Sequence, residues 1–77
     1  MDFKQILTDI AKAIVDNPEA VNVVENVDGD EVELVLTVAE SDTGMVIGRH
    51  GRIAKAIRQI MKAAANTCNK RVTVEIK

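Results

Sequence analysis

The chain has 77 residues, of which 47% are hydrophobic and 29% charged, enough for one folded domain over residues 1–77 with little room for a deep catalytic cavity. Its single cysteine, Cys68, excludes an internal disulfide and is too few for a zinc cluster, which favours a reducing compartment. The net charge of −2 divides unevenly: residues 1–42 carry eleven acidic and two basic side chains, whereas residues 43–77 carry one acidic and eight basic. Because an electrostatic footprint is local, the basic half can still bind nucleic acid.

The first predicted element is a helix. Asp2 is a suitable N-cap residue, and Gln5 three positions later completes a capping-box pattern. An apolar stripe at helical spacing follows, made of Phe3, Ile6, Leu7, Ile10 and Ile14. The helix should end before Asn17-Pro18, because the residue that precedes a proline disfavours helical geometry. Acids interrupt the apolar pattern, so this segment is neither a signal peptide nor a membrane span, and we expect a cytoplasmic protein.

Two strands joined by a tight turn are predicted next. Ala20–Val27 has the composition of a strand, although its alternation is imperfect, and Asp28-Gly29-Asp30 is typical of a turn. Glu31–Val38 alternates cleanly, with one apolar face and one that carries Glu31 and Glu33. The apolar face consists of Val32, Leu34, Leu36 and Val38. The two strands should therefore pair as an antiparallel hairpin.

The second half of the chain is predicted to hold two helices and a last strand. Ser41 is a candidate cap for a short helix that contains Met45, Val46 and Ile47. The chain then passes through Gly48–Gly51 into a longer helix over about Arg52–Ala65, and a final strand begins at Lys70. Its buried face would consist of Val72, Val74 and Ile76. The order α-β-β-α-α-β predicts an α+β fold with a three-stranded mixed sheet and the helices packed on one face.

The helix after Gly51 is strongly amphipathic. At 100° per residue, one narrow apolar sector contains Ile53, Ile57, Ile60 and Ala64, and the opposite side contains Arg52, Lys55, Arg58 and Lys62. A solvated helix face is the simplest explanation, but this face has no acid to form i,i+4 ion pairs. Arg49 and Arg52 also lie near the helix start, where the positive end of the helix dipole disfavours cations. Such an excess of positive charge is typical of an anion-binding site.

Two glycines frame the loop between the two predicted helices. Gly48 and Gly51 allow positive φ and a close approach of a ligand backbone, although a tight corner would need glycines for its geometry alone. The segment VIGRHGRIAKAI, residues 46–57, closely resembles the signature of KH domains, in which a GxxG loop joins two helices and an isoleucine follows at fixed spacing. The predicted element order resembles the type II, prokaryotic arrangement. The length resembles that of the small bacterial KH-domain proteins of the KhpA (YlqC) family.

This resemblance implies a groove for about four unpaired nucleotides, with the glycine loop clamping their backbone. The clamp would consist of Gly48, Arg49, His50 and Gly51. Ile47 and Ile53 match apolar positions at the groove, although both could equally belong to the core, and His50 could simply be exposed. With Arg52 and Lys55 of the basic face, these residues form the predicted RNA-binding site. The resemblance also implies a homodimer, or a heterodimer with a larger KH-domain protein, that acts in RNA regulation or as an RNA chaperone.

Phe3 is the only aromatic residue, so bases cannot stack on aromatic side chains and we expect weak affinity with modest sequence preference. Two alternatives stay open: a protein-interaction or dimerisation module whose acidic half binds a basic partner, and a single-stranded DNA binder. GMVIGRHG, residues 44–51, lacks the Gly-Lys-Ser/Thr ending of a nucleotide P-loop. The chain also lacks an evident nucleophile–base set, paired catalytic carboxylates or metal ligands. We therefore expect no enzyme, cofactor, metal, membrane or small-molecule substrate.

Overall fold

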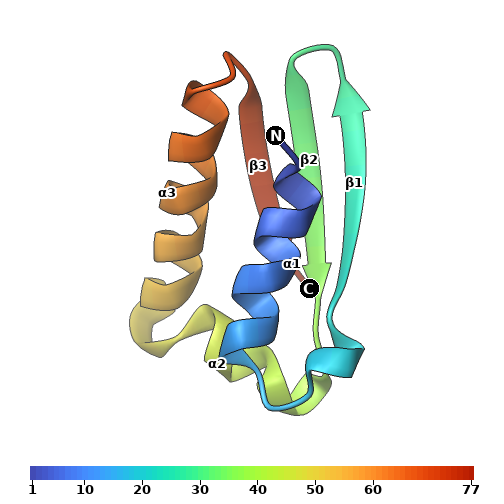
Figure 1. Ribbon diagram of the computed structural model, residues 1–77. Helices are drawn as coiled ribbons and strands as arrows, with labels where there is room; N and C mark the ends of the chain where they lie inside the picture. Colours follow the sequence, from blue (N-terminus) through green and yellow to red (C-terminus); the bar gives the residue numbers. More distant parts are fainter.

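The computed structural model describes residues 1–77 and contains helices α1 (Phe3–Ile14), α2 (Thr43–Ile47) and α3 (Arg52–Asn66) and strands β1 (Asn22–Asp28), β2 (Glu31–Thr37) and β3 (Arg71–Ile76). Short 3-10 turns at Pro18–Ala20, Glu40–Asp42 and Arg49–Gly51 join some of these elements. Figure 1 shows α1 and α3 side by side in front of the sheet, with α2 near the lower ends of both helices. The predicted order of helices and strands is confirmed.

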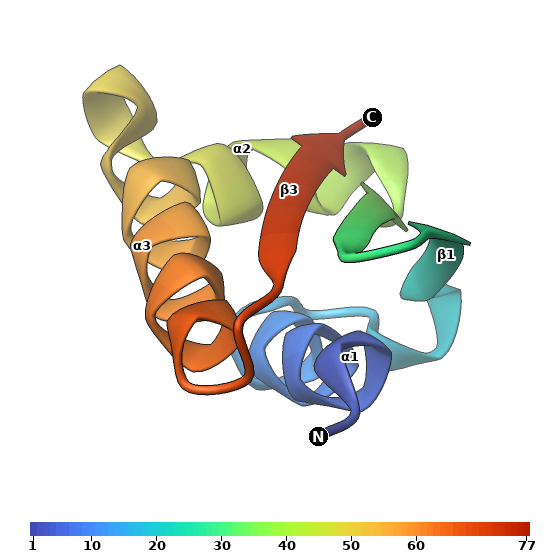
Figure 2. The same ribbon diagram turned by 90° about the horizontal axis from the view of Figure 1, so that it is seen from above.

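The sheet has the strand order β1-β2-β3, in which β1 runs antiparallel and β3 parallel to the central strand β2. A two-residue turn, Gly29-Asp30, joins β1 to β2, and its glycine has a φ of 61°. The view from above shows α1 and α3 on the same side of the sheet, with α2 adjoining α3 (Figure 2). The predicted α+β class, with a three-stranded mixed sheet and helices on one face, is therefore confirmed.

The core lies between that face of the sheet and the helices. The alternation predicted for the central strand is confirmed, because its apolar face is buried while Glu31 and Glu33 are exposed. The buried cluster combines Val32, Leu34, Leu36 and Val38 with Phe3, Leu7 and Ala11 of α1, Ile57, Met61 and Ala65 of α3, and Val74 of β3. No helix combines the length and the apolar composition that crossing a bilayer requires.

The start of α1 follows the predicted cap only in part. The side chain of Asp2 accepts a hydrogen bond from the backbone N–H of Gln5 at 3.0 Å, as expected of an N-cap residue. The side chain of Gln5 does not complete the capping box, because its Nε2 donates to Asp9 Oδ1 at 2.8 Å instead. The helix ends at Ile14, ahead of Pro18 as predicted, and β1 begins at Asn22 because Pro18–Ala20 forms a 3-10 turn.

The predicted cap of α2 is wrong. The N-cap residue is Asp42 rather than Ser41, and its side chain does not cap the helix. The Asp42 carboxylate, 1% exposed, instead accepts hydrogen bonds from the backbone N–H of Asn17 at 3.0 Å, from Asn17 Nδ2 at 3.1 Å and from the backbone N–H of Asp16 at 3.4 Å. These bonds join the end of α1 to the start of α2, and so fix where the following loop lies.

The buried face of α3 also differs from the predicted one. Ala54, Ile57, Met61 and Ala65 are buried, whereas two isoleucines of the predicted apolar sector, Ile53 and Ile60, are 37% and 51% exposed. The helix packs against both α1 and β3, so its inner face is the one between these two neighbours. The small side chains of Ala54 and Ala65 allow a close approach there, which leaves the larger isoleucines toward the outside.

Candidate nucleic-acid interface

The four residues between α2 and α3 form a tight left-handed turn. Gly48, His50 and Gly51 have φ values of 75°, 58° and 72°. The backbone N–H of Gly48 donates to the carbonyl of Gly44 at 2.8 Å, and that of Gly51 donates to the carbonyl of Gly48 at 3.1 Å. The backbone N–H groups of Arg49 and His50, by contrast, donate to no acceptor of the chain. Successive free amides in a helical and then left-handed conformation form a concave anion-binding nest.

The two glycines of the loop serve different needs. A Cβ built on Gly48 would lie 2.6 Å from Cγ1 of Ile53, so the isoleucine side chain packs directly over this glycine. A Cβ built on Gly51 meets nothing within 4 Å, so only the positive φ at that position requires glycine. Ile53 therefore holds the first residue of the loop against the first turn of α3.

The structure brings all eight predicted site residues together at the start of α3. Arg49, His50, Arg52 and Lys55 are exposed, and the two glycines are partly exposed. Ile47 and Ile53 are 38% and 37% exposed, so neither belongs to the buried core. The alternative of two core isoleucines is thereby resolved in favour of a surface position beside the loop.

Positive charge at this end of the molecule is uncompensated. The first turn of α3 has no acidic residue and no side-chain cap. The two salt bridges of the structure join Lys70 to Asp30 and Arg71 to Glu31, so they leave Arg49, Arg52 and Lys55 unpaired. Three unpaired cations next to two free backbone amides favour the binding of an anion.

The basic side of α3 continues toward β3. Arg58 was predicted on the basic face but not in the binding site, and its Nε donates to the carbonyl of Val74 at 3.2 Å, on the outer edge of β3. One turn further, Lys62 lines a hollow of about 490 Å³ with Lys70, Arg71 and Val72. The helical spacing of Arg58 and Lys62 could have added them to the predicted site. Their position next to β3 depends on tertiary packing and could not be predicted from spacing.

These features define the class of the protein. A chain with the order α-β-β-α-α-β, a mixed three-stranded sheet and a Gly-x-x-Gly turn between its second and third helices is a type II KH domain. A family model described as "KhpA/KhpB, KH domain" matches residues 4–76. The chain therefore belongs to the KhpA/KhpB family of KH-domain proteins.

Relatives of nearly equal length share this assignment. The chain is 55% identical over 74 residues to RNA-binding protein KhpA of Clostridium acetobutylicum, which covers 96% of this chain and 99% of the relative. It is 51% identical over 72 residues to RNA-binding protein KhpA of Caldanaerobacter subterraneus subsp. tengcongensis, covering 94% and 96%. RNA-binding protein KhpA of Chlamydia trachomatis is 40% identical over 74 residues, covering 96% and 95%.

Solved structures of Era contain the same fold within a longer chain. Era of Aquifex aeolicus, in a Y63A variant bound to GDP.AlF4-, superposes with a TM-score of 0.68 at 19% identity. Era in complex with MgGDPNP and nucleotides 1506–1542 of 16S ribosomal RNA superposes with a TM-score of 0.70, also at 19% identity. Each match covers 96% of this chain but only 29% and 28% of the Era chains, so the likeness concerns the KH fold alone.

Proposed function

We propose that this protein binds single-stranded RNA and that the loop Gly48–Gly51 clamps the phosphate backbone. The observation that carries the proposal is the pair of free amide N–H groups at Arg49 and His50, which lie between two glycines and beside unpaired cations. A phosphate oxygen supplies the acceptor that these amides lack within the chain. The relatives, which are named RNA-binding proteins, support RNA as the ligand.

The side chains around the loop supply the rest of the binding site. Arg52 and Lys55 project from the first turns of α3 and would meet neighbouring phosphates, while Ile47 and Ile53 offer exposed aliphatic surface to the bases. Aromatic stacking contributes about 1–3 kcal/mol per base in other single-strand binders, and this chain has no aromatic residue except the buried Phe3. A single domain should therefore bind weakly and with modest sequence preference.

We further propose that residues 1–77 work as one KH domain without catalytic activity, in the cytoplasm, as a post-transcriptional regulator or RNA chaperone. Weak binding with little sequence preference suits a protein that engages many RNAs transiently. The relatives that the chain matches over nearly their whole length are named RNA-binding proteins, which supports a role in RNA binding for the KH domain itself.

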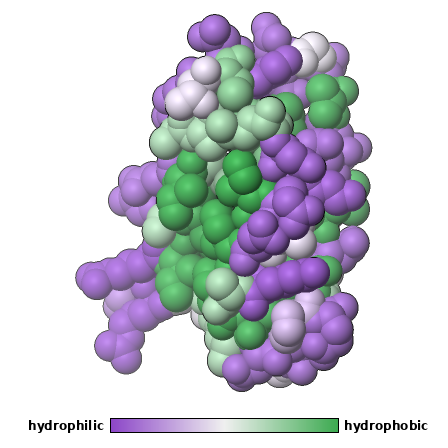
Figure 3. Space-filling view, in the orientation of Figure 1, coloured by the Kyte–Doolittle hydropathy of each residue, from purple (hydrophilic) through white to green (hydrophobic).

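A second surface favours pairing with another KH domain. Ile60 of α3 is exposed, and Ile6, Ile10 and Ile14 of α1 are only partly buried. Figure 3 shows a band of hydrophobic surface along the seam where α1 and α3 adjoin. Contiguous apolar surface of this kind marks interaction sites. We propose that it pairs two copies of this chain, or one copy with a larger KH-domain protein; a family model that spans both KhpA and KhpB supports such a partner.

Salt-dependent binding tests the proposed clamp. If the loop and the start of α3 meet roughly two to four phosphates, log K should fall with log salt at a slope of about −1.4 to −2.8 for a single-stranded RNA oligomer. A slope near zero would show that the cations are only solvated surface. Competition with a DNA oligomer of equal sequence measures whether the clamp discriminates RNA from single-stranded DNA, because it need not contact the 2′-OH.

A further inference from the structure

Strand β1 forms an open edge of the sheet. It pairs only with β2, and no backbone hydrogen bond outside the helices and the sheet involves residues 22–28. Figure 1 shows β1 at the side of the sheet with no element beyond it. The opposite edge is partly covered, since Arg58 Nε donates to a carbonyl of β3. Alternate N–H and C=O groups along seven residues of β1 are therefore free to pair with another strand.

The side chains of β1 add apolar surface to this edge. Val23 is its only buried residue. Val24 and Val27 are 47% and 62% exposed and, because they differ by an odd number of positions, they point to opposite faces of the strand. A strand added along the edge would cover both valines while its backbone pairs with β1, which is how extended peptides dock on sheet edges elsewhere.

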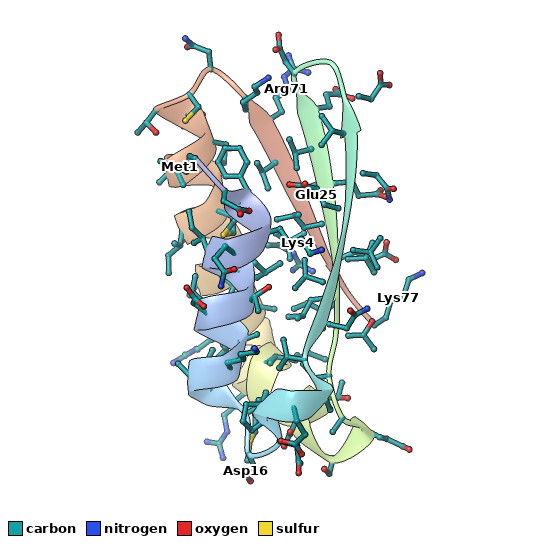
Figure 4. The ribbon with its side chains drawn as sticks, turned by 45° about the vertical axis from the view of Figure 1, so that its right-hand side comes forward. Met1, Lys4, Asp16, Glu25, Arg71 and Lys77 are labelled. Carbon is teal, nitrogen blue, oxygen red and sulfur yellow. The ribbon has the colours of Figure 1, made fainter.

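The charge around the edge is predominantly negative. Residues 13–48 contain nine acidic side chains and no Lys, Arg or His. Glu25 and Asp28 lie on β1 itself, are exposed and form no salt bridge. In Figure 4, Lys4 of α1 extends toward β1, but no salt bridge joins it to Glu25. A hollow of about 480 Å³ at the turn end of the strands is lined by the carboxylates of Asp28, Glu31 and Glu33 and by Arg71. Arg71 pairs with Glu31 at 3.7 Å, which leaves Asp28 and Glu33 without a salt bridge.

The same charges disfavour a second copy of the chain as the occupant. Antiparallel pairing of two β1 strands about their midpoint would set Glu25 opposite Glu25 of the second copy, and like charges directly opposite each other destabilise a ladder. Edge strands of natural sheets commonly carry charged side chains, especially lysine, which hinder pairing with strands of other chains. An acidic edge repels acidic strands and attracts cationic ones.

We propose that the β1 edge docks an extended cationic segment of another protein by strand addition. Backbone hydrogen bonds to β1 would supply affinity, and Lys or Arg side chains of the segment would meet Glu25, Asp28 and Glu33, which form no salt bridge within the chain. The edge lies on the side of the molecule away from α3 (Figures 1 and 2), so the segment and an RNA strand occupy separate surfaces. This docking site does not depend on the RNA-binding proposal.

The test uses RNA-free protein, because a cationic peptide binds RNA directly. The probe is a fluorescent peptide, matched in length to β1, in which Lys and Arg alternate with Val and Thr. We expect saturable binding, with amide chemical-shift changes concentrated at residues 22–28. A peptide with the same charges but proline at alternate positions cannot donate the backbone hydrogen bonds and should bind about tenfold more weakly or worse.

Charge reversal on the protein completes the test. Glu25→Lys with Asp28→Lys should lower the affinity for the alternating peptide about tenfold or more. The matched control, Glu19→Lys with Glu40→Lys, makes the same change in net charge at exposed positions outside the edge and should keep most of the affinity. The proposal would be overturned if the alternating peptide did not bind, or if its binding changed the shifts of residues away from β1. It would equally be overturned if the two peptides bound with the same affinity, or if the two double variants had the same effect. Pairing of β1 between two protein copies would overturn it in favour of self-association.

Discussion

A Cβ atom on Gly48 would lie 2.6 Å from Cγ1 and 2.9 Å from Cβ of Ile53, closer than non-bonded carbon atoms approach in proteins. Gly48 also has φ 75° and ψ 171°, a region that essentially only glycine occupies. Ile53 therefore constrains the loop through direct contact, and the loop cannot accept a side chain at its first position without moving the isoleucine or the start of α3.

The two loop glycines should respond differently to alanine. Gly48→Ala combines backbone strain with the clash against Ile53 and should lower the free energy of unfolding by about 2–3 kcal/mol or more. Gly51→Ala adds only left-handed strain in open space and should cost about 1–2 kcal/mol. Gly44→Ala, inside α2 with nothing near its added Cβ, is the control and should be neutral or stabilising. Urea denaturation measures all three, and equal losses at the two loop positions would contradict the role given to Ile53.

The buried carboxylate of Asp42 should be a main determinant of stability. Asp42→Ala leaves the backbone N–H of Asn17 and its Nδ2 without their shared acceptor and opens a buried space, so we expect a loss of about 2–4 kcal/mol. Ser41→Ala removes only a long, exposed hydrogen bond, from Asn17 Nδ2 to Ser41 Oγ at 3.5 Å, and should change stability by less than about 0.5 kcal/mol. Thermal denaturation of both variants gives the comparison. Similar melting temperatures would mean that the Asp42 hydrogen bonds add little to the native state.

Asp42 also illustrates what the sequence could and could not predict. Helix and strand periodicity predicted every regular element and the inward face of β2, because those patterns depend on local geometry. Ser41 was predicted as the cap because local rules cannot detect a partner 25 residues away at Asn17. A buried carboxylate of this kind takes its role from tertiary contacts alone.

The same limit applied to α3. Its most hydrophobic sector predicts a buried Ile60, yet packing against two neighbours buries Met61 and leaves Ile60 about half exposed. The loop was easier to predict, since Gly48, Gly51 and the surrounding cations are contiguous in the sequence and remain together in the fold. The contact of Arg58 with β3 was not predictable, because it depends on where the last strand lies.

Ile60, which is about half exposed on α3, should control self-association. If the seam between α1 and α3 pairs two copies, Ile60→Glu would place an uncompensated charge in the interface and should convert the dimer to a monomer. Val24→Glu makes the same change at a similarly exposed position on the sheet and should leave the dimer intact. Light scattering at high micromolar concentration measures the mass. A monomeric parent protein, or a dimer unaffected by Ile60→Glu, would contradict this pairing mode.

Replacing Arg49 and His50 together with aspartate should abolish RNA binding and leave the fold intact. Both side chains are exposed, so the change removes little packing. Aspartate is one of the residues that tolerate the left-handed backbone conformation of His50, whose φ is 58°. The new carboxylates would lie where a phosphate is expected, so attraction becomes repulsion while the backbone amides stay in place.

Stability should move in the opposite direction from affinity. The first turn of α3 has neither an acidic residue nor a side-chain cap, and a negative charge near a helix N-terminus contributes about 0.3–1 kcal/mol. The double variant should therefore melt at the same temperature as the parent or slightly higher, while RNA affinity is lost in a filter-binding or anisotropy assay. Lys4→Asp with Lys77→Asn changes the net charge equally at exposed positions outside the loop and should keep most of the affinity. If the loop has a purely structural role, both variants should bind RNA as the parent protein does. That result would leave a protein-interaction module as the better explanation of the protein's function.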